Sequence, residues 1–206
     1  MVSARGAIVS TMEITANRTR PRTVTVAGTL QLLFALAFLI APLAGLIYGG
    51  DVQAAADAEL VRQGLSPSVL AENNVHFDEG GYALVLPMTT AVIATLLAWL
   101  NLAGKRAGRI LTLIVQPIFL LLDVFILTSQ ASKVQYLQSI LGNGADALAV
   151  LDASESVYPG WLLAVSGGRL VFTPLVSLTV IVLLLLPSAR AYFRKRAVAS
   201  HSGRTW

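Results

Sequence analysis

Apolar residues fall in four long blocks, and polar residues are concentrated in the segments between them. The blocks are residues 24–48, 82–102, 110–129 and 170–186. A helix rises 1.5 Å per residue, so about 20 apolar residues cross the roughly 30 Å hydrocarbon core of a membrane. The fourth block is slightly short and reaches full length if residues 161–165 lie at the interface. No block alternates with a period of two, so the pattern predicts an all-α integral membrane four-helix bundle.

The segments between the blocks divide the chain into tails, hairpins and a turn. The predicted divisions are a basic tail at 1–22, a first transmembrane hairpin at 23–103 with an outer loop at 49–81, a turn at 104–109, a second hairpin at 110–187 with an outer loop at 130–168, and a basic tail at 188–206. Both loops contain helix-compatible stretches, at 51–63, 68–72, 129–141 and 145–151, with Gly64 and Gly142 as helix stops. We therefore expect two helical extracytoplasmic loops that form a small acidic cap.

Basic residues gather on one side of the predicted membrane. Four arginines lie in the amino-terminal tail, Lys105, Arg106 and Arg109 lie in the turn, and five basic residues lie in the carboxyl tail, so twelve of the fifteen share one side. The positive-inside rule then places both termini in the cytoplasm of an inner (plasma) membrane protein. Tyr192 and Phe193 fit either an interfacial segment or a plain flanking tail.

The second and fourth blocks begin alike. Gly81 of a Gly-Gly pair is followed six residues later by Pro87, and Gly168 of a second pair is followed six residues later by Pro174. This likeness has two interpretations. The chain contains two parallel copies of one hairpin, or glycine and proline recur here because both are common where loops meet helices.

One ionisable residue lies within a block, where a charge is costly and requires a specific environment. This residue is Asp123, and Gln116 and Gln130 lie seven positions on either side of it, on the same helix face. We expect Arg169, at the outer start of the fourth block, to pair with Asp123, and Gln31 to hydrogen-bond to Gln116. This polar stripe has three interpretations: a structural clasp between helices, a contact with a partner subunit, and a proton or substrate site.

Small residues recur every four positions in the first block, at Ala37, Ala41, Gly45 and Gly49. Small side chains at this spacing let two helices approach closely. The pattern predicts a helix-packing ladder, and it leaves open whether the ladder packs within this chain or against another one.

Composition excludes several classes of protein. Hydrophobic residues make up 55% of the chain and charged residues only 13%, about half the share that soluble domains carry. There is no cysteine, and the two histidines, His76 and His201, match no zinc spacing. Phosphate-loop, dinucleotide-binding and nucleophile-elbow motifs are also missing. We expect no enzymatic activity, cofactor or metal. The net charge of +4 reflects the basic inner side and does not indicate nucleic-acid binding.

The layout runs basic tail, span, acidic loop, span, Lys105-Arg106 turn, span, acidic loop, span, basic tail, in a chain rich in Ala, Val and Leu. This layout resembles that of small four-span accessory subunits of actinobacterial, and especially mycobacterial, membrane complexes, such as those that accompany Mce lipid importers. The resemblance implies a non-enzymatic subunit that contacts membrane lipids and other membrane-protein subunits. The alternative is a small transporter or lipid-binding protein with an intramembrane Asp/Gln site.

Overall fold

A computed structural model describes residues 20–77 and 84–202, with side chains described as far as Arg194. Within these ranges the chain forms helices and turns and no strand. The helices are α2 (Arg22–Arg62), α3 (Ser68–Glu72), α4 (Val85–Leu102), α5 (Arg106–Leu141), α6 (Ala147–Glu155), α7 (Gly160–Leu185) and α8 (Pro187–Ser202). Most of the amino-terminal tail, the Gly80-Gly81 pair, the predicted start of the second span at residue 82 and the His201 side chain lie outside the described residues.

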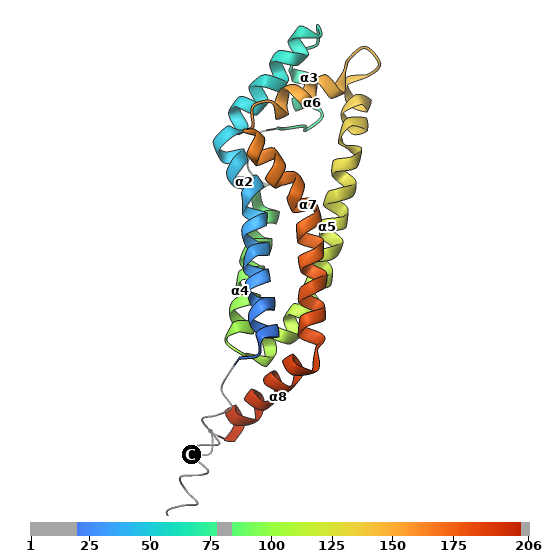
Figure 1. The fold of residues 1–206 in the computed structure, drawn as a ribbon. Helices are drawn as coiled ribbons and strands as arrows, with labels where there is room; N and C mark the ends of the chain where they lie inside the picture. Colours follow the sequence, from blue (N-terminus) through green and yellow to red (C-terminus); the bar gives the residue numbers. More distant parts are fainter. Residues whose placement is uncertain (1–19, 78–83, 203–206) are drawn as a thin grey trace, which may run out of the picture.

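Four of these helices, α2, α4, α5 and α7, are long and apolar enough to cross a membrane. They form an elongated bundle in which α2 packs on α4 and α7, and α5 packs on the same two neighbours (Figure 1). The most exposed large side chains include Leu46, Ile47, Leu121 and Phe125 on the outside of this bundle. Such an apolar surface is suited to lipid rather than to water.

Two of the four long helices extend well beyond the predicted spans. Helix α2 has 41 residues and continues to Arg62, and α5 has 36 residues and continues to Leu141. Each ends next to a glycine with a positive φ, 80° at Gly64 and 77° at Gly142, a conformation that other residues adopt only at a cost. The helical stretches predicted at 51–63 and 129–141 are thus continuations of the spanning helices, whereas those at 68–72 and 145–151 correspond to the separate helices α3 and α6.

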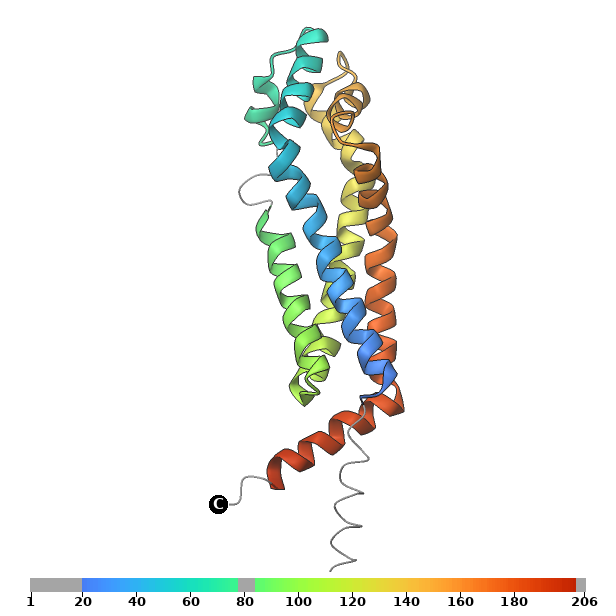
Figure 2. The same ribbon diagram turned by 60° about the vertical axis from the view of Figure 1, so that its left-hand side comes forward.

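The outer ends of α2 and α5 pack with α3 and α6 into a cap at one end of the bundle (Figures 1 and 2). The cap has its own hydrophobic core, which consists of Ala56, Leu60, Leu70, Leu137, Leu141, Ala147, Val150 and Leu151. Helix α6 begins at Ala147, and the N-cap residue before it is Asp146, whose side chain accepts a hydrogen bond from the Ala149 amide. Gln63, which follows α2, links the first outer loop to the second. Its side-chain amide donates a hydrogen bond to the carbonyl oxygen of Asp146 and accepts one from the N–H of the same residue.

The fourth long helix starts earlier than its apolar block. Helix α7 begins at Gly160, so Gly167 and Gly168 lie inside a helix and do not mark its start. The upper part of α7 slants across the bundle before the helix turns along it (Figure 1). The second glycine pair therefore does not lie at the start of a spanning helix, and the predicted repeat of two parallel hairpins is not confirmed.

Helix α8 lies obliquely across the other end of the bundle (Figure 2). Leu186 has a ψ of 146°, which ends α7, and Pro187 then opens α8 as proline commonly does at a first helical position. Ala189 and Phe193 are fully buried and belong to the core of the bundle. The start of the carboxyl tail is therefore a docked helix and not a plain flanking tail.

Candidate functional site

Five buried polar side chains meet in the half of the bundle that lies away from the cap, and we call them the inner polar cluster. They are Gln31 on α2, Asn101 on α4, Thr112 and Gln116 on α5, and Ser177 on α7, each no more than 1% exposed. All four long helices contribute to this cluster. In an apolar interior such groups are tolerated only when they bond to one another.

The hydrogen bonds of the inner polar cluster connect all four long helices. The Asn101 amide donates to Gln31 Oε1 at 2.9 Å and to Thr112 Oγ1 at 2.8 Å. Gln31 Nε2 donates to Thr112 Oγ1 at 3.3 Å and, as expected, to Gln116 Oε1 at 3.5 Å. Gln116 Nε2 donates to Ser177 Oγ at 3.0 Å. These bonds fix the four helices at one relative depth.

Asp123 lies two helical turns above Gln116 on the same face of α5. It is 7% exposed, and its Oδ1 lies 2.8 Å from the Thr173 hydroxyl on α7. Its second oxygen, Oδ2, has no hydrogen-bond partner among the described groups. Because Thr173 and Ser177 are four residues apart on α7, they face Asp123 and Gln116 at two successive levels of one helix interface.

The expected ion pair between Asp123 and Arg169 is not formed. Thr173 takes the place next to the carboxyl, and the Arg169 guanidinium carbon lies 5.1 Å from the centroid of the Phe38 ring on α2. A guanidinium group over an aromatic face gains a cation–π attraction. Arg169 directly precedes the predicted fourth span, and its side chain packs against α2 at the level of Phe38.

The small-residue ladder on α2 is mostly enclosed by the chain itself. Ala37, Gly45 and Gly49 are buried, and Ala41 is partly buried. The residues of the polar stripe differ more, since Gln116 and Asp123 are buried while Gln130 is exposed. A partner subunit could therefore not use the whole ladder or the inner part of the stripe, because helices of this chain already cover them.

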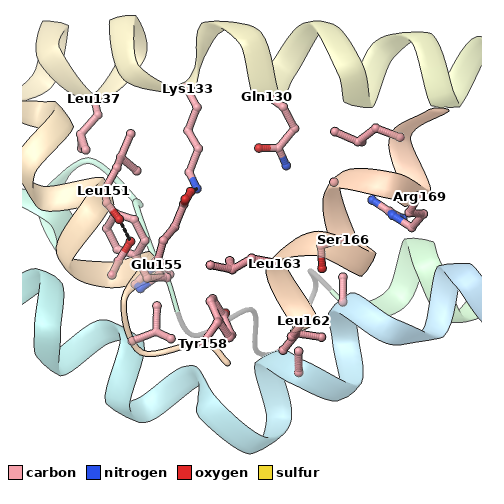
Figure 3. A pocket seen from close by; sticks show the side chains of 18 of the residues that line it. Gln130, Lys133, Leu137, Leu151, Glu155, Tyr158, Leu162, Leu163, Ser166 and Arg169 are labelled. Atoms are coloured by element: carbon pink, nitrogen blue, oxygen red, sulfur yellow. Dashed lines mark hydrogen bonds and ion pairs between the residues drawn. The ribbon is translucent and has the colours of Figure 1, made fainter. Parts of the chain in front are cut away.

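A cavity of about 510 Å³ lies between the outer half of the bundle and the cap. Its walls come from α2, α5, α6, α7 and the segment after α3, and Figure 3 shows Gln130 and Arg169 toward one end. Lys133 and Glu155 face each other across it, with Nζ 3.6 Å from Oε1. Neither Asp123 nor Gln116 lines this cavity. The intramembrane site expected of a transporter is thus filled by side chains, and the open space lies above it.

Four elements of these sites were not predicted from the sequence: Asn101, Thr173, Ser177 and the cavity. Asn101, Thr173 and Ser177 were not predicted because a single Asn at a span end, or a single Ser or Thr within a span, has no distinctive spacing. The cavity was missed because its lining residues come from four helices far apart in the chain. Its signal in the sequence was the pair Gln130 and Arg169, which mark the outer ends of two neighbouring spans.

Among the side chains that the structure describes, no group of three or more His, Cys, Asp or Glu residues is placed to hold a metal ion. The site chemistry visible in this part of the chain is hydrogen bonding, one exposed ion pair and one stacked guanidinium group. Comparison of the chain with protein-family models, with curated proteins and with solved structures finds no match.

Proposed function

We propose that this chain is a non-enzymatic accessory subunit of a larger inner-membrane complex, with lipid as the molecule that the complex handles. The observation that supports the lipid link most strongly is the cavity, which has walls of both apolar and polar side chains, a partly buried arginine and a position at the end of the predicted spans. Concave sites with mostly apolar walls and a few polar groups are the usual form of small-molecule sites.

A partner would bind surfaces other than those that the sequence first indicated. The inner polar cluster and most of the ladder are enclosed, so they stabilise the subunit and leave its outside free. The outer part of α5 remains exposed at Tyr136, which also lies at the edge of the cavity. Aromatic side chains at such positions are common anchors in protein interfaces, and this face of the cap is our candidate for the contact with a partner.

The second candidate function is a lipid-binding membrane protein that acts alone. The same cavity favours it. A transporter that uses Asp123 and Gln116 as its substrate site is less well supported, because both side chains are packed in the helix interface and do not line the open space.

Affinity purification of the tagged full chain in a mild detergent, followed by mass spectrometry of proteins and extracted lipids, tests the proposal. We expect a stoichiometric set of membrane-protein partners. A Tyr136→Ala variant should lose them, and a Trp99→Ala variant, which changes an exposed aromatic on α4, should keep them. If the protein purifies alone and stable, the accessory-subunit proposal fails. Lipid that remains bound would then favour the second candidate.

A further inference from the structure

Three arginines gather at the end of the bundle opposite the cap, where α8 lies (Figure 2). Arg109, near the start of α5, is partly buried, and the like charges of Arg190 on α8 and Arg106 on α5 act on it. We call these three residues the arginine cluster. Like charges held close together repel one another, so the cluster is stable only with negative charge beside it.

The chain itself offers little negative charge to the arginine cluster. Nine of its eleven acids lie in the two outer loops, and the other two are Asp123 in the third span and Glu13 in the amino-terminal tail. Glu13 lies outside the described residues, and it is one acid beside twelve basic residues in the tails and the turn. Within the described part of the chain, both ion pairs join residues of the outer loops, so neither includes the cluster.

One guanidinium group of the cluster is held in place by the end of a helix. Arg109 Nε donates a hydrogen bond to the Leu184 carbonyl oxygen at 2.9 Å. This carbonyl lies in the last turn of α7, where carbonyl groups lack a helical N–H partner because the helix ends at Leu185. The bond leaves the Nη groups of Arg109 without a partner among the described groups. The N–H groups of a guanidinium fork are suited to phosphate oxygens.

The arginine cluster lies at the depth of lipid headgroups. Arg109 directly precedes the third apolar block, and Arg190 follows the fourth by about one helical turn. This depth is the same whichever end of the bundle faces the cytoplasm. On the membrane side of the cluster the exposed side chains include Ile110 on α5 and Leu185 on α7, each 46% exposed. The acyl chains of a lipid would cover such side chains, whereas a soluble phosphate ester would not.

We propose that the arginine cluster binds one anionic phospholipid that has two phosphate groups. Arg109 binds one phosphate, Arg190 on α8 binds the other, and Arg106 lies beside them. Two negative charges offset most of the repulsion among three guanidinium groups, whereas a headgroup with a single phosphate leaves two positive charges uncompensated. This site lies at the opposite end of the bundle from the cavity and does not depend on the proposed accessory function.

Native mass spectrometry of the detergent-purified full chain tests the site with three probes: cardiolipin, phosphatidylglycerol and inorganic pyrophosphate. We expect one cardiolipin per chain, retained at least about tenfold more strongly than phosphatidylglycerol. Arg190→Gln and Arg106→Gln should each weaken this retention about fivefold. Arg194→Gln is the matched control, because Arg194 is exposed on α8 and is not among the charges that act on Arg109. This control should change nothing.

Other results would overturn the proposal. Equal retention of the two lipids, or a preference for cardiolipin that survives both Arg190→Gln and Arg106→Gln, would mean that the cluster does not recognise two phosphates. An equal loss with Arg194→Gln would mean that the basic surface attracts lipid as a whole and holds no single site. Pyrophosphate binding as tight as that of cardiolipin would identify a site for soluble diphosphates. Partner capture by the wild-type chain is measured separately, so these results leave the accessory-subunit proposal untouched.

Discussion

The Thr173 hydroxyl has two close oxygen neighbours and only one proton. It lies 3.0 Å from the carbonyl oxygen of Arg169 and 2.8 Å from Oδ1 of Asp123. A carbonyl oxygen can only accept a hydrogen bond, so the hydroxyl proton is used if that bond forms. The contact with Asp123 is then a full hydrogen bond only if the carboxyl group supplies a proton of its own. With the hydroxyl bonded to the carbonyl of Arg169, the geometry is complete with a neutral Asp123, which needs no counter-ion; a charged Asp123 would instead accept the hydroxyl proton itself.

This proton count predicts that Asp123→Asn is tolerated. The asparagine amide donates to Thr173 in place of the acid proton and keeps the volume of the side chain. We expect the thermal unfolding midpoint in detergent to stay near the wild-type value. Asp123→Leu removes the donor and adds volume in a packed interface, and it should destabilise by roughly 1–3 kcal/mol. If Asp123→Asn were as damaging as Asp123→Leu, the carboxyl would be acting as a charged group.

Gln31 forms hydrogen bonds to three other members of the inner polar cluster. Gln31→Leu leaves the Gln116 carbonyl oxygen without its donor in a buried site, and the free energy of unfolding should fall by roughly 1–3 kcal/mol. Gln135→Leu is the matched control, because Gln135 is exposed on the outer part of α5. Equal thermal midpoints for the two variants would mean that the cluster contributes nothing to stability.

At the scale of the elements, a close approach between two helices lies where α4 is followed by α5. A Cβ atom on Gly108 would lie 2.6 Å from the Leu100 Cβ and 2.8 Å from the Leu100 backbone carbon. Backbone cannot move aside as the end of a flexible side chain can. The absence of a side chain at Gly108 therefore sets how closely the two helices approach, and this approach brings Asn101 and Thr112 within hydrogen-bond distance.

Gly108→Ala should accordingly destabilise the bundle, by roughly 1–3 kcal/mol for an overpacked contact. Gly168→Ala is the contrasting change, since a Cβ there meets nothing within 4 Å and Gly168 lies inside α7. Alanine is the better helix former, so this variant should be unchanged or more stable by about 0.5–1 kcal/mol. Thermal unfolding of both variants, monitored by tryptophan fluorescence, gives the comparison, and a stable Gly108→Ala would contradict the close approach.

Helix existence was predictable from the sequence because apolar length and glycine or proline stops are local signals. The stops at Gly64 and Gly142 and the continuation of α5 to Leu141 follow from them. Which side chains contact one another was less predictable, because these contacts depend on the direction in which each side chain points from its helix. Gln31 and Gln116 could be paired by depth alone, but nothing local shows that Arg169 turns toward Phe38 and leaves Asp123 to Thr173. The roles of the buried residues Asn101 and Ser177 become visible only in the packed bundle, where each forms a hydrogen bond to a side chain of another helix.

At the scale of the whole molecule, the orientation in the membrane remains a prediction from the distribution of basic residues. The chain has no cysteine, so single introduced cysteines report their own position without background. The cap offers Glu72 at the end of α3, which is exposed, and Gly144 between α5 and α6, where a Cβ meets nothing within 4 Å. The opposite end offers the exposed residues Lys105 and Arg194.

We expect a membrane-impermeant maleimide to label Glu72→Cys and Gly144→Cys in sealed right-side-out vesicles. Lys105→Cys and Arg194→Cys should react only after the vesicles are opened, because four spans return the chain to the side on which it began. Labelling in the reverse pattern would place the cap in the cytoplasm, and the arginine cluster would then face the outer leaflet. Labelling of Glu72→Cys and Lys105→Cys from the same side would mean that α4 does not cross the membrane, and the four-span arrangement itself would fail.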